Sequence, residues 1–213
     1  MMTTDHATAR RALALLDLTD LADTASVEST AALCARAVSP PVPVAAVCVW
    51  PRFVAAARAR LGPGGVQIAT VVNFPAGTSP RDTVLDEIDG ALAAGADEID
   101  LVLPWRAFLA GDRQTAAAMV EAARARCGEA LLKVILETGE YPDLAAVRGA
   151  SDLAIAAGAD FIKTSTGKTA HSATLPAART MLEAIAESGR PVGLKPSGGL
   201  RSLADAAAYL ALA

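Results

Sequence analysis

The sequence predicts a parallel α/β fold whose sheet closes into a barrel. Short apolar runs rich in β-branched residues alternate with alanine-rich stretches, and they recur about 30 residues apart, the length of one strand plus one helix. The pattern continues without a break in composition, which favours a single series of units. An early apolar run, Leu13 to Leu18, is a candidate first strand. The later runs begin near Val44, Gln67, Glu98, Leu131, Asp160 and Pro191.

A repeated segment favours the barrel over an open sheet. Residues 93–100 and 156–163 both begin with Ala-Ala-Gly-Ala-Asp, so each ends a helix at a glycine and then starts a strand. Asp100 and Lys163 therefore occupy equivalent strand positions, which in a barrel point to the same side of the wall. A doubly wound open sheet is the alternative. It favours a glycine-rich first turn, and the sequence has no Gly-x-Gly-x-x-Gly.

The remaining segments are consistent with one domain over residues 1–213, with a short N-terminal helical extension. Residues 26–38 predict a helix, with Ser26 as its N-cap. Pro40-Pro41-Val42-Pro43 reads as a stiff entry into the second strand and not as a domain boundary. The last residues, 209–213, fall inside the expected seventh helix.

Composition excludes several classes of protein. The chain is 53% apolar and carries a net charge of −4, which argues against disorder and against a nucleic-acid partner. Glycines and prolines interrupt the longest uncharged stretch, Leu61 to Pro80, so we expect no membrane span, and with no secretory signal evident we expect a cytoplasmic protein. Three scattered cysteines and two distant histidines predict no disulfide framework and no metal site.

Lysine use is unusual. Only four of the 19 basic residues are lysines, and three of these, Lys133, Lys163 and Lys195, lie in predicted strands. Unlike arginine, lysine can lose its proton and attack a carbonyl. The alternative is that each is a strand-end residue whose ammonium reaches solvent or pairs with a carboxylate. Their shared strand context, together with Asp100 on a fourth strand, favours a functional cluster.

Such a cluster predicts Schiff-base chemistry. Two neighbouring lysines in an apolar barrel mouth cannot both remain protonated cheaply, so we expect one pKa to fall well below its ordinary value. That lysine becomes the nucleophile, and the other stays charged. Asp100, with a bound water, can move protons while the carbinolamine forms and dehydrates. Barrel enzymes keep such sites at the C-terminal ends of their strands.

Two loops add a candidate anion site. Residues 164–169 and 196–199 follow the strands of Lys163 and Lys195, and their glycines allow backbone N–H groups to approach an anion. Plain turns are the alternative. Gly167-Lys168-Thr169 is not a nucleotide-binding P-loop, because Ile162 stands where the first glycine is required.

Six segments together resemble the deoxyribose-phosphate aldolase family; they are residues 47–53, 71–75, 95–102, 132–138, 158–167 and 192–199. The resemblance implies an α/β fold of the (β/α)8 TIM-barrel type and a class I, metal-independent aldolase that needs no cofactor. Its reaction would be the reversible cleavage of 2-deoxy-D-ribose 5-phosphate to acetaldehyde and D-glyceraldehyde 3-phosphate. The partners implied are thus a sugar phosphate and an aldehyde.

The resemblance also implies residue roles. Lys163 would form the Schiff base, Lys195 would lower its pKa, and Asp100 would serve the proton relay beside Lys133. Cys48 would lie near the aldehyde, although a small buried hydrophobe is the alternative for this residue. The other implied substrate-binding residues are Thr19, Gly167, Lys168, Gly198 and Gly199.

One departure from the family pattern keeps alternatives open. The eighth strand–helix unit is absent from the given chain, so we expect a longer native protein. Without that unit, an inactive paralogue that only binds a sugar phosphate is an alternative. A class I aldolase for another aldehyde or ketose phosphate is a second, and a non-enzymatic interaction module is a third. Alanine-rich helix faces would also suit a homodimer.

Overall fold

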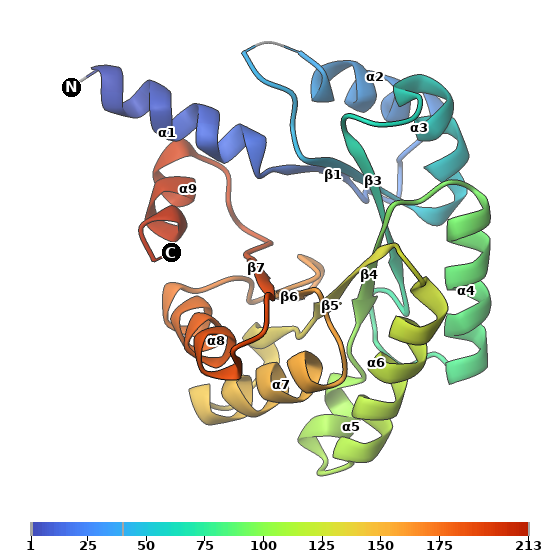
Figure 1. The fold of residues 1–213 in the computed structure, drawn as a ribbon, viewed down its shortest axis with the longest axis vertical. Helices are drawn as coiled ribbons and strands as arrows, with labels where there is room; N and C mark the ends of the chain where they lie inside the picture. Colours follow the sequence, from blue (N-terminus) through green and yellow to red (C-terminus); the bar gives the residue numbers. More distant parts are fainter. Residues whose placement is uncertain (1, 40, 213) are drawn as a thin grey trace.

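A computed structural model describes residues 2–39 and 41–212; Met1, Pro40 and Ala213 lie outside the described residues. The described residues form one parallel sheet whose strands follow one another in chain order (Figure 1). Its strands are β1 (Asp17–Asp20), β2 (Ala46–Val49), β3 (Gln67–Val72), β4 (Glu98–Val102), β5 (Leu131–Ile135), β6 (Phe161–Lys163) and β7 (Gly193–Lys195).

Helices surround the outer face of the sheet, and the first helix, α1, packs against the last, α9 (Figure 1). None of the described helices is long and apolar enough to cross a membrane. The helices are α1 (Met2–Ala14), α2 (Val27–Ala37), α3 (Val54–Leu61), α4 (Arg81–Ala93), α5 (Trp105–Leu109), α6 (Arg113–Cys127), α7 (Leu144–Ala156), α8 (Leu175–Ser188) and α9 (Leu203–Leu210), with 3-10 turns η1 (Pro51–Phe53) and η2 (Thr138–Glu140).

The sheet curls so far that strands distant in its order meet through their side chains. Lys133 on β5 places its Nζ 3.0 Å from Oδ2 of Asp17 on β1. Lys195 on β7 approaches the other oxygen of Asp17 to 2.5 Å and donates to the carbonyl of Leu15 at 3.0 Å. Among the described residues, β1 and β7 are the two edge strands of the sheet. They do not pair with each other, and no further strand lies between them. The observed architecture is thus a curled, seven-stranded parallel sheet. Lys195 on one edge strand, β7, connects it to Asp17 on the other edge strand, β1.

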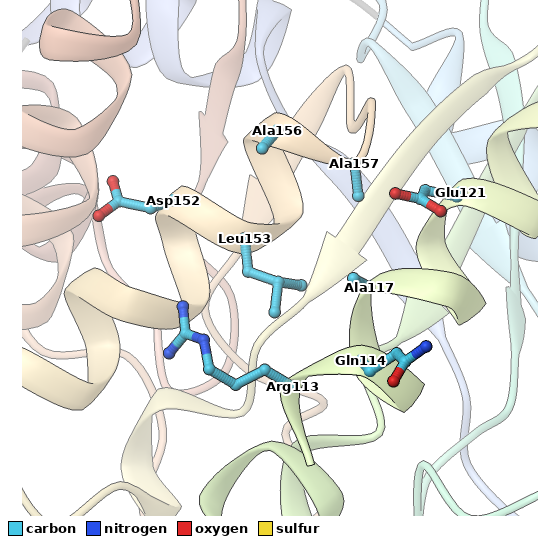
Figure 2. Close-up of a pocket in the computed structure, with 8 residues that line it drawn as sticks. All are labelled: Arg113, Gln114, Ala117, Glu121, Asp152, Leu153, Ala156 and Ala157. Atoms are coloured by element: carbon cyan, nitrogen blue, oxygen red, sulfur yellow. The ribbon is translucent and has the colours of Figure 1, made fainter. Parts of the chain in front are cut away.

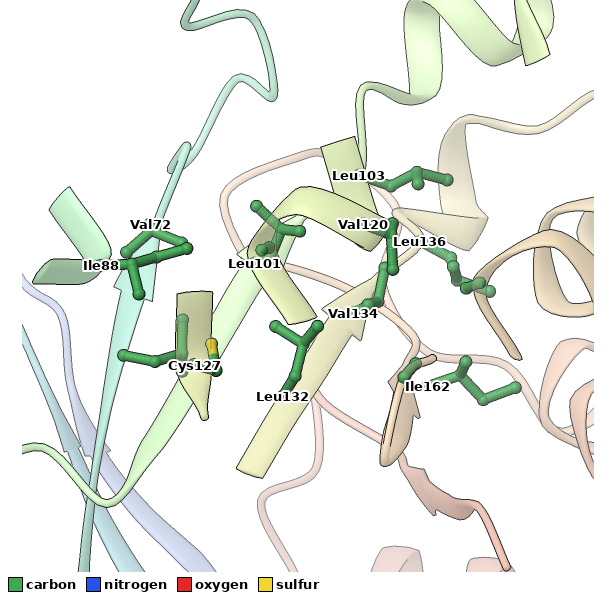
Figure 3. Close-up of a cluster of buried hydrophobic side chains, with 14 of the residues drawn as sticks. Val72, Ile88, Leu101, Leu103, Val120, Cys127, Leu132, Val134, Leu136 and Ile162 are labelled. Atoms are coloured by element: carbon green, nitrogen blue, oxygen red, sulfur yellow. The ribbon is translucent and has the colours of Figure 1, made fainter. Parts of the chain in front are cut away.

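Alternation along the strands separates two environments. On β4, Ile99 and Leu101 point outward and Asp100 points into the curl, where it meets lysines from β5 and β6. The outward residues pack against the helices and form the main core (Figure 3). Labelled members of that core are Val72, Ile88, Leu101, Leu103, Val120, Cys127, Leu132, Val134, Leu136 and Ile162.

Most expected elements are confirmed, with one correction at the first strand. Ser26 caps α2, and its hydroxyl accepts from the N–H of Ser29. Gly95 and Gly158 follow α4 and α7 with φ values of 99° and 102°, so both sit in the left-handed region expected after a helix. Leu13, however, belongs to α1, and β1 begins only at Asp17. The run from Leu13 to Leu18 in fact spans the end of that helix, the turn after it and the first two residues of β1.

The repeated segment has a structural counterpart at the N-terminal ends of the strands. Arg58 donates to Oδ2 of Asp97, which also accepts the N–H of Ile68 at 2.8 Å. In the second copy, Arg124 pairs with Asp160, and Oδ2 of Asp160 accepts the N–H of Leu132 at 2.8 Å. Each aspartate therefore joins a helix to the start of the neighbouring strand.

We expect Asp160→Ala to lower the free energy of unfolding by about 2 kcal/mol, because it leaves the Leu132 N–H and the Arg124 guanidinium without this acceptor. Urea denaturation would measure the change. Asp152→Ala is the matched control: it removes an exposed carboxylate that pairs with Arg148 within α7, and it should cost no more than about 0.5 kcal/mol. Equal losses in the two variants would contradict the role given to Asp160.

Candidate active site

The centre of the candidate site is Asp100, which lies in the middle of β4 and is fully buried. Its two carboxylate oxygens accept from two different lysines. Lys133 Nζ donates to Oδ1 at 3.1 Å, and Lys163 Nζ donates to Oδ2 at 2.5 Å. The equivalence of Asp100 and Lys163 seen in the repeat thus places their side chains in direct contact.

The contacts continue into a network of alternating charge. Lys133 also pairs with Glu98 and Asp17, and Asp17 pairs with Lys195. Three ammonium groups therefore face three carboxylates across the interior of the sheet, where their charges balance. All three predicted strand lysines belong to this network. Each of them pairs with a carboxylate, which was the alternative interpretation of these lysines.

Asp17 and Glu98 belong to the network but were not among the site residues predicted from the sequence. A signal was available, because each is an acidic residue within or beside an apolar strand run, where unpaired charges are rare. The run alone does not reveal which lysine each carboxylate meets. Lys133 and Asp17 are 116 residues apart in the chain.

The network sets the protonation of its buried members. Burial alone would raise the pKa of Asp100, but Lys133 and Lys163 outweigh it and lower that pKa to about 2. Burial would lower the pKa of Lys133, but Asp100, Asp17 and Glu98 raise it well above its ordinary value. Asp100 is therefore a carboxylate and Lys133 an ammonium at neutral pH.

The expected fall in the pKa of a strand lysine is wrong for Lys163 in this structure. Burial does act to lower the pKa of Lys163, but the carboxylate of Asp100 outweighs it, and the pKa is raised. The cation that opposes the charge of Lys163 is Lys133, whereas Lys195 is engaged with Asp17. The expectation weighed burial and like charge but omitted a carboxylate in direct contact.

Cys48 and Thr19 are register partners on β2 and β1. Cys48 is fully buried, and burial raises the pKa of its thiol to about 12, so it is a neutral thiol. Thr19 is exposed at the edge of the sheet, where its hydroxyl donates to the carbonyl of Asp17 at 2.9 Å. Both lie beside the network, Thr19 accessible and Cys48 enclosed.

Apolar side chains surround the charged network. One small cluster contains Ala46, Cys48, Ala69, Val71 and Leu21, and a second contains Val102, Trp105 and Ile135. Phe74 touches both clusters. These residues lower the local dielectric, which strengthens the ion pairs and makes an unpaired charge costly.

The two predicted anion loops meet at the C-terminal ends of β6 and β7. The N–H of Ser165 donates to the Ser197 hydroxyl, which donates in turn to the Ser165 carbonyl at 2.5 Å. Gly167 and Gly198 approach so closely that a Cβ built on Gly198 would lie 3.4 Å from the Cα of Gly167. Gly167, Gly198 and Gly199 all have positive φ, a backbone conformation that favours glycine.

Lys168 extends from the first of these loops toward the N-terminal half of the chain. Its Nζ donates to the carbonyl of Leu21 at 2.8 Å and lies 5.8 Å from the centre of the Trp50 ring. Unlike the three strand lysines, Lys168 is half-exposed. It therefore places a positive charge at the rim of the site, where an anion can reach it.

The described residues also form two cavities in the outer layer. One, of about 480 Å³, lies between α6 and α7 and is lined by residues such as Arg113, Leu153 and Ala157 (Figure 2). The other, of about 610 Å³, lies beside the start of α4. Neither is lined by a lysine. In the described part of the chain, no three His, Cys, Asp or Glu side chains are arranged to hold a metal ion.

Comparisons with known proteins find similar sequences that cover most of the chain. The family model described as DeoC/LacD family aldolase matches residues 1–211. A deoxyribose-phosphate aldolase from Agrobacterium fabrum is 54% identical over 203 residues, which are 94% of this chain and 78% of that protein.

Solved structures are similar in fold. A Toxoplasma gondii structure assigned as a deoxyribose-phosphate aldolase has a TM-score of 0.91 and 31% identity, with 99% of this chain and 84% of that chain covered. The deoxyribose phosphate aldolase of Aeropyrum pernix, described as tetrameric, has a TM-score of 0.81 and 26% identity, with coverages of 94% and 83%. By its sequence and its fold, the chain belongs to the DeoC/LacD family of aldolases.

Proposed function

We propose that this aldolase cleaves 2-deoxy-D-ribose 5-phosphate reversibly to acetaldehyde and D-glyceraldehyde 3-phosphate through a Schiff base on Lys163. The observation that carries the proposal is the contact of a lysine only 6% exposed with a fully buried carboxylate, Nζ to Oδ2 2.5 Å. The substrate is supported by the names of the relatives, and the scaffold proposed is a barrel of the (β/α)8 type.

The first step requires the neutral amine of Lys163. Once it has lost its proton, its nitrogen attacks the aldehyde carbon of the open-chain sugar, and a carbinolamine forms. Protonation of the carbinolamine hydroxyl then lets water leave, and an iminium ion remains. Asp100, with a bound water, carries these protons, because its carboxylate already touches Lys163. Lys133 and Lys195 stay charged and keep the neighbouring carboxylates paired.

Cleavage then breaks the bond between C2 and C3 of the sugar. A base takes the proton from the C3 hydroxyl, whose electrons form the aldehyde of D-glyceraldehyde 3-phosphate. The electrons of the broken bond pass to the iminium nitrogen and leave an enamine. Protonation of the enamine at C2 and hydrolysis release acetaldehyde and the amine. The iminium is the electron sink, so the reaction as proposed calls for no metal and no cofactor.

The phosphate is proposed to bind where the two glycine loops meet. Backbone N–H groups around Gly167, Gly198 and Gly199 supply donors, and Lys168 supplies a charge at the rim. Thr19 is proposed to hydrogen-bond a sugar hydroxyl, and Cys48 to line the aldehyde end. We also propose a cytoplasmic location, which three buried free cysteines support.

Incubation with acetaldehyde and borohydride should leave one ethyl group on Lys163, because borohydride reduces a Schiff base to a stable secondary amine. Peptide mass spectrometry would locate it. We expect no mark on Lys133, which pairs with three carboxylates, or on Lys195, which pairs with Asp17 and also donates to the Leu15 carbonyl, whereas Lys163 pairs with Asp100 alone.

Lys163→Arg is the control, since arginine keeps the charge but cannot become a neutral nucleophile. It should abolish both the mark and turnover of 2-deoxyribose 5-phosphate. Turnover by this variant would overturn the assignment. A mark on Lys163 without turnover of this substrate would instead favour an aldolase for another aldehyde or ketose phosphate.

The pH dependence of trapping should shift in Asp100→Asn. The carboxylate raises the pKa of Lys163, so its removal leaves burial and Lys133 to lower that pKa. We expect the midpoint of the trapping rate against pH to move to lower pH, while turnover falls about 100-fold or more as proton transfer is lost. Glu121→Gln removes an equal charge from the exposed face of α6 and should move neither quantity. A midpoint that stays in place or rises would contradict the role of Asp100.

A further inference from the structure

Glu137 is a buried carboxylate that the proposed reaction leaves unused. It lies two residues after the end of β5, is completely buried, and has a left-handed φ of 61°, a conformation that is costly for a residue with a side chain. The backbone is anchored on both sides of it. The N–H of Leu136 donates to the carbonyl of Lys163, and the N–H of Thr138 donates to that of Thr164, both at 2.9 Å. Glu137 is therefore held against the end of β6.

Its carboxylate is occupied by the loop that follows β6. Oε1 accepts the N–H of Thr166 at 3.1 Å and the hydroxyl of Thr169 at 3.4 Å, and Oε2 accepts the hydroxyl of Thr166 at 2.5 Å. Within the described residues, no lysine or arginine forms an ion pair with Glu137. A buried carboxylate that lacks a cation is expensive, and here hydrogen bonds to one loop are its compensation.

Thr166 connects Glu137 to the rest of the candidate anion-binding loop, residues 164–169. Its hydroxyl, while donating to Glu137, accepts the N–H of Lys168 at 3.0 Å, which closes a turn around Gly167. Gly167 is the residue that packs against Gly198 of the second loop. The position of the Gly167 turn thus depends on Glu137 chiefly through Thr166, whose N–H and hydroxyl both donate to that carboxylate.

Close packing keeps the same loop on the 3-10 turn that begins beside Glu137. A Cβ built on Gly139 would lie 2.4 Å from the carbonyl oxygen of His171, so only glycine permits this approach. The Thr169 hydroxyl shares its single proton between Glu137 and that carbonyl, and it is nearer to the carbonyl, at 2.9 Å. The loop is therefore tied to η2 at two places, by the Glu137 carboxylate and by the contact at Gly139.

We propose that Glu137 is a positioning residue, which acts through Thr166 to hold the loop of residues 166–169 in the shape that binds the substrate phosphate. This inference rests on the proposed function. Both oxygens of Glu137 are taken by loop donors, so it is assigned no proton-transfer step. Its effect should appear in the recognition of the phosphate and not in the chemistry of Lys163.

The test compares 2-deoxyribose 5-phosphate with unphosphorylated 2-deoxyribose as substrates of Glu137→Gln. Glutamine keeps one acceptor oxygen but directs an NH2 group at a loop donor, so the turn should lose its fixed position. We expect KM for the phosphorylated sugar to rise about tenfold or more, with kcat little changed. The preference for the phosphorylated sugar, as a ratio of kcat/KM values, should fall by the same factor.

Two further variants keep the test decisive. Thr166→Val removes the connecting hydroxyl and leaves Glu137 in place, so it should lower the same ratio even if Glu137→Gln folds poorly. Glu140→Gln is the matched control, because it neutralises a half-buried carboxyl of η2 outside these contacts and should leave the ratio unchanged.

The outcomes separate this inference from the proposed function. If Glu137→Gln and Thr166→Val depress kcat/KM equally for both sugars, or leave the ratio unchanged, the positioning role is wrong although the enzyme acts as proposed. If the unmodified protein cleaves neither sugar, the proposed function fails, and the inference falls with it. A selective rise in KM for the phosphorylated sugar in both variants supports the inference.

Discussion

The structure depends on neutralising one fully buried carboxylate. Asp100 stands in the apolar interior of the curled sheet, where an unpaired charge would be prohibitively costly. Lysines from β5 and β6 meet its two oxygens, and Asp17 on β1 then links the network to β7. The contacts satisfy the charges. Those between β4 and β6, β1 and β5, and β1 and β7 also connect strands that are not neighbours in the sheet.

The pairing of Lys163 with Asp100 sets the protonation state from which the proposed reaction starts. A resting Lys163 paired with Asp100 is an ammonium, whereas the proposed reaction needs a neutral amine. The carboxylate that holds the proton in place is also the group closest to receive or relay it. Strongly perturbed pKa values of this kind cluster at functional sites.

The loops proposed to bind the substrate phosphate are distinct from the strands that carry this chemistry. The strands supply the charged network, while the loops after β6 and β7 supply glycine turns and the exposed ammonium of Lys168. Glu137 connects the two regions, because it follows β5 and holds the first loop through Thr166. Rigid strands with a tethered loop are a common way to keep catalytic groups fixed while a ligand is bound.

The sequence by itself determined the parallel α/β class, the location of most strands, the glycine turns and the group of strand lysines. These features follow from local periodicity and from residue types whose conformation or chemistry is restricted. Only the tertiary structure decided that Asp17 and Glu98 join the network, that the pKa of Lys163 is raised, and that Glu137 holds the loop at Thr166. Each of these depends on contacts between residues 29 or more positions apart, whose distances and burial are set by the curl of the sheet and not by the neighbouring sequence.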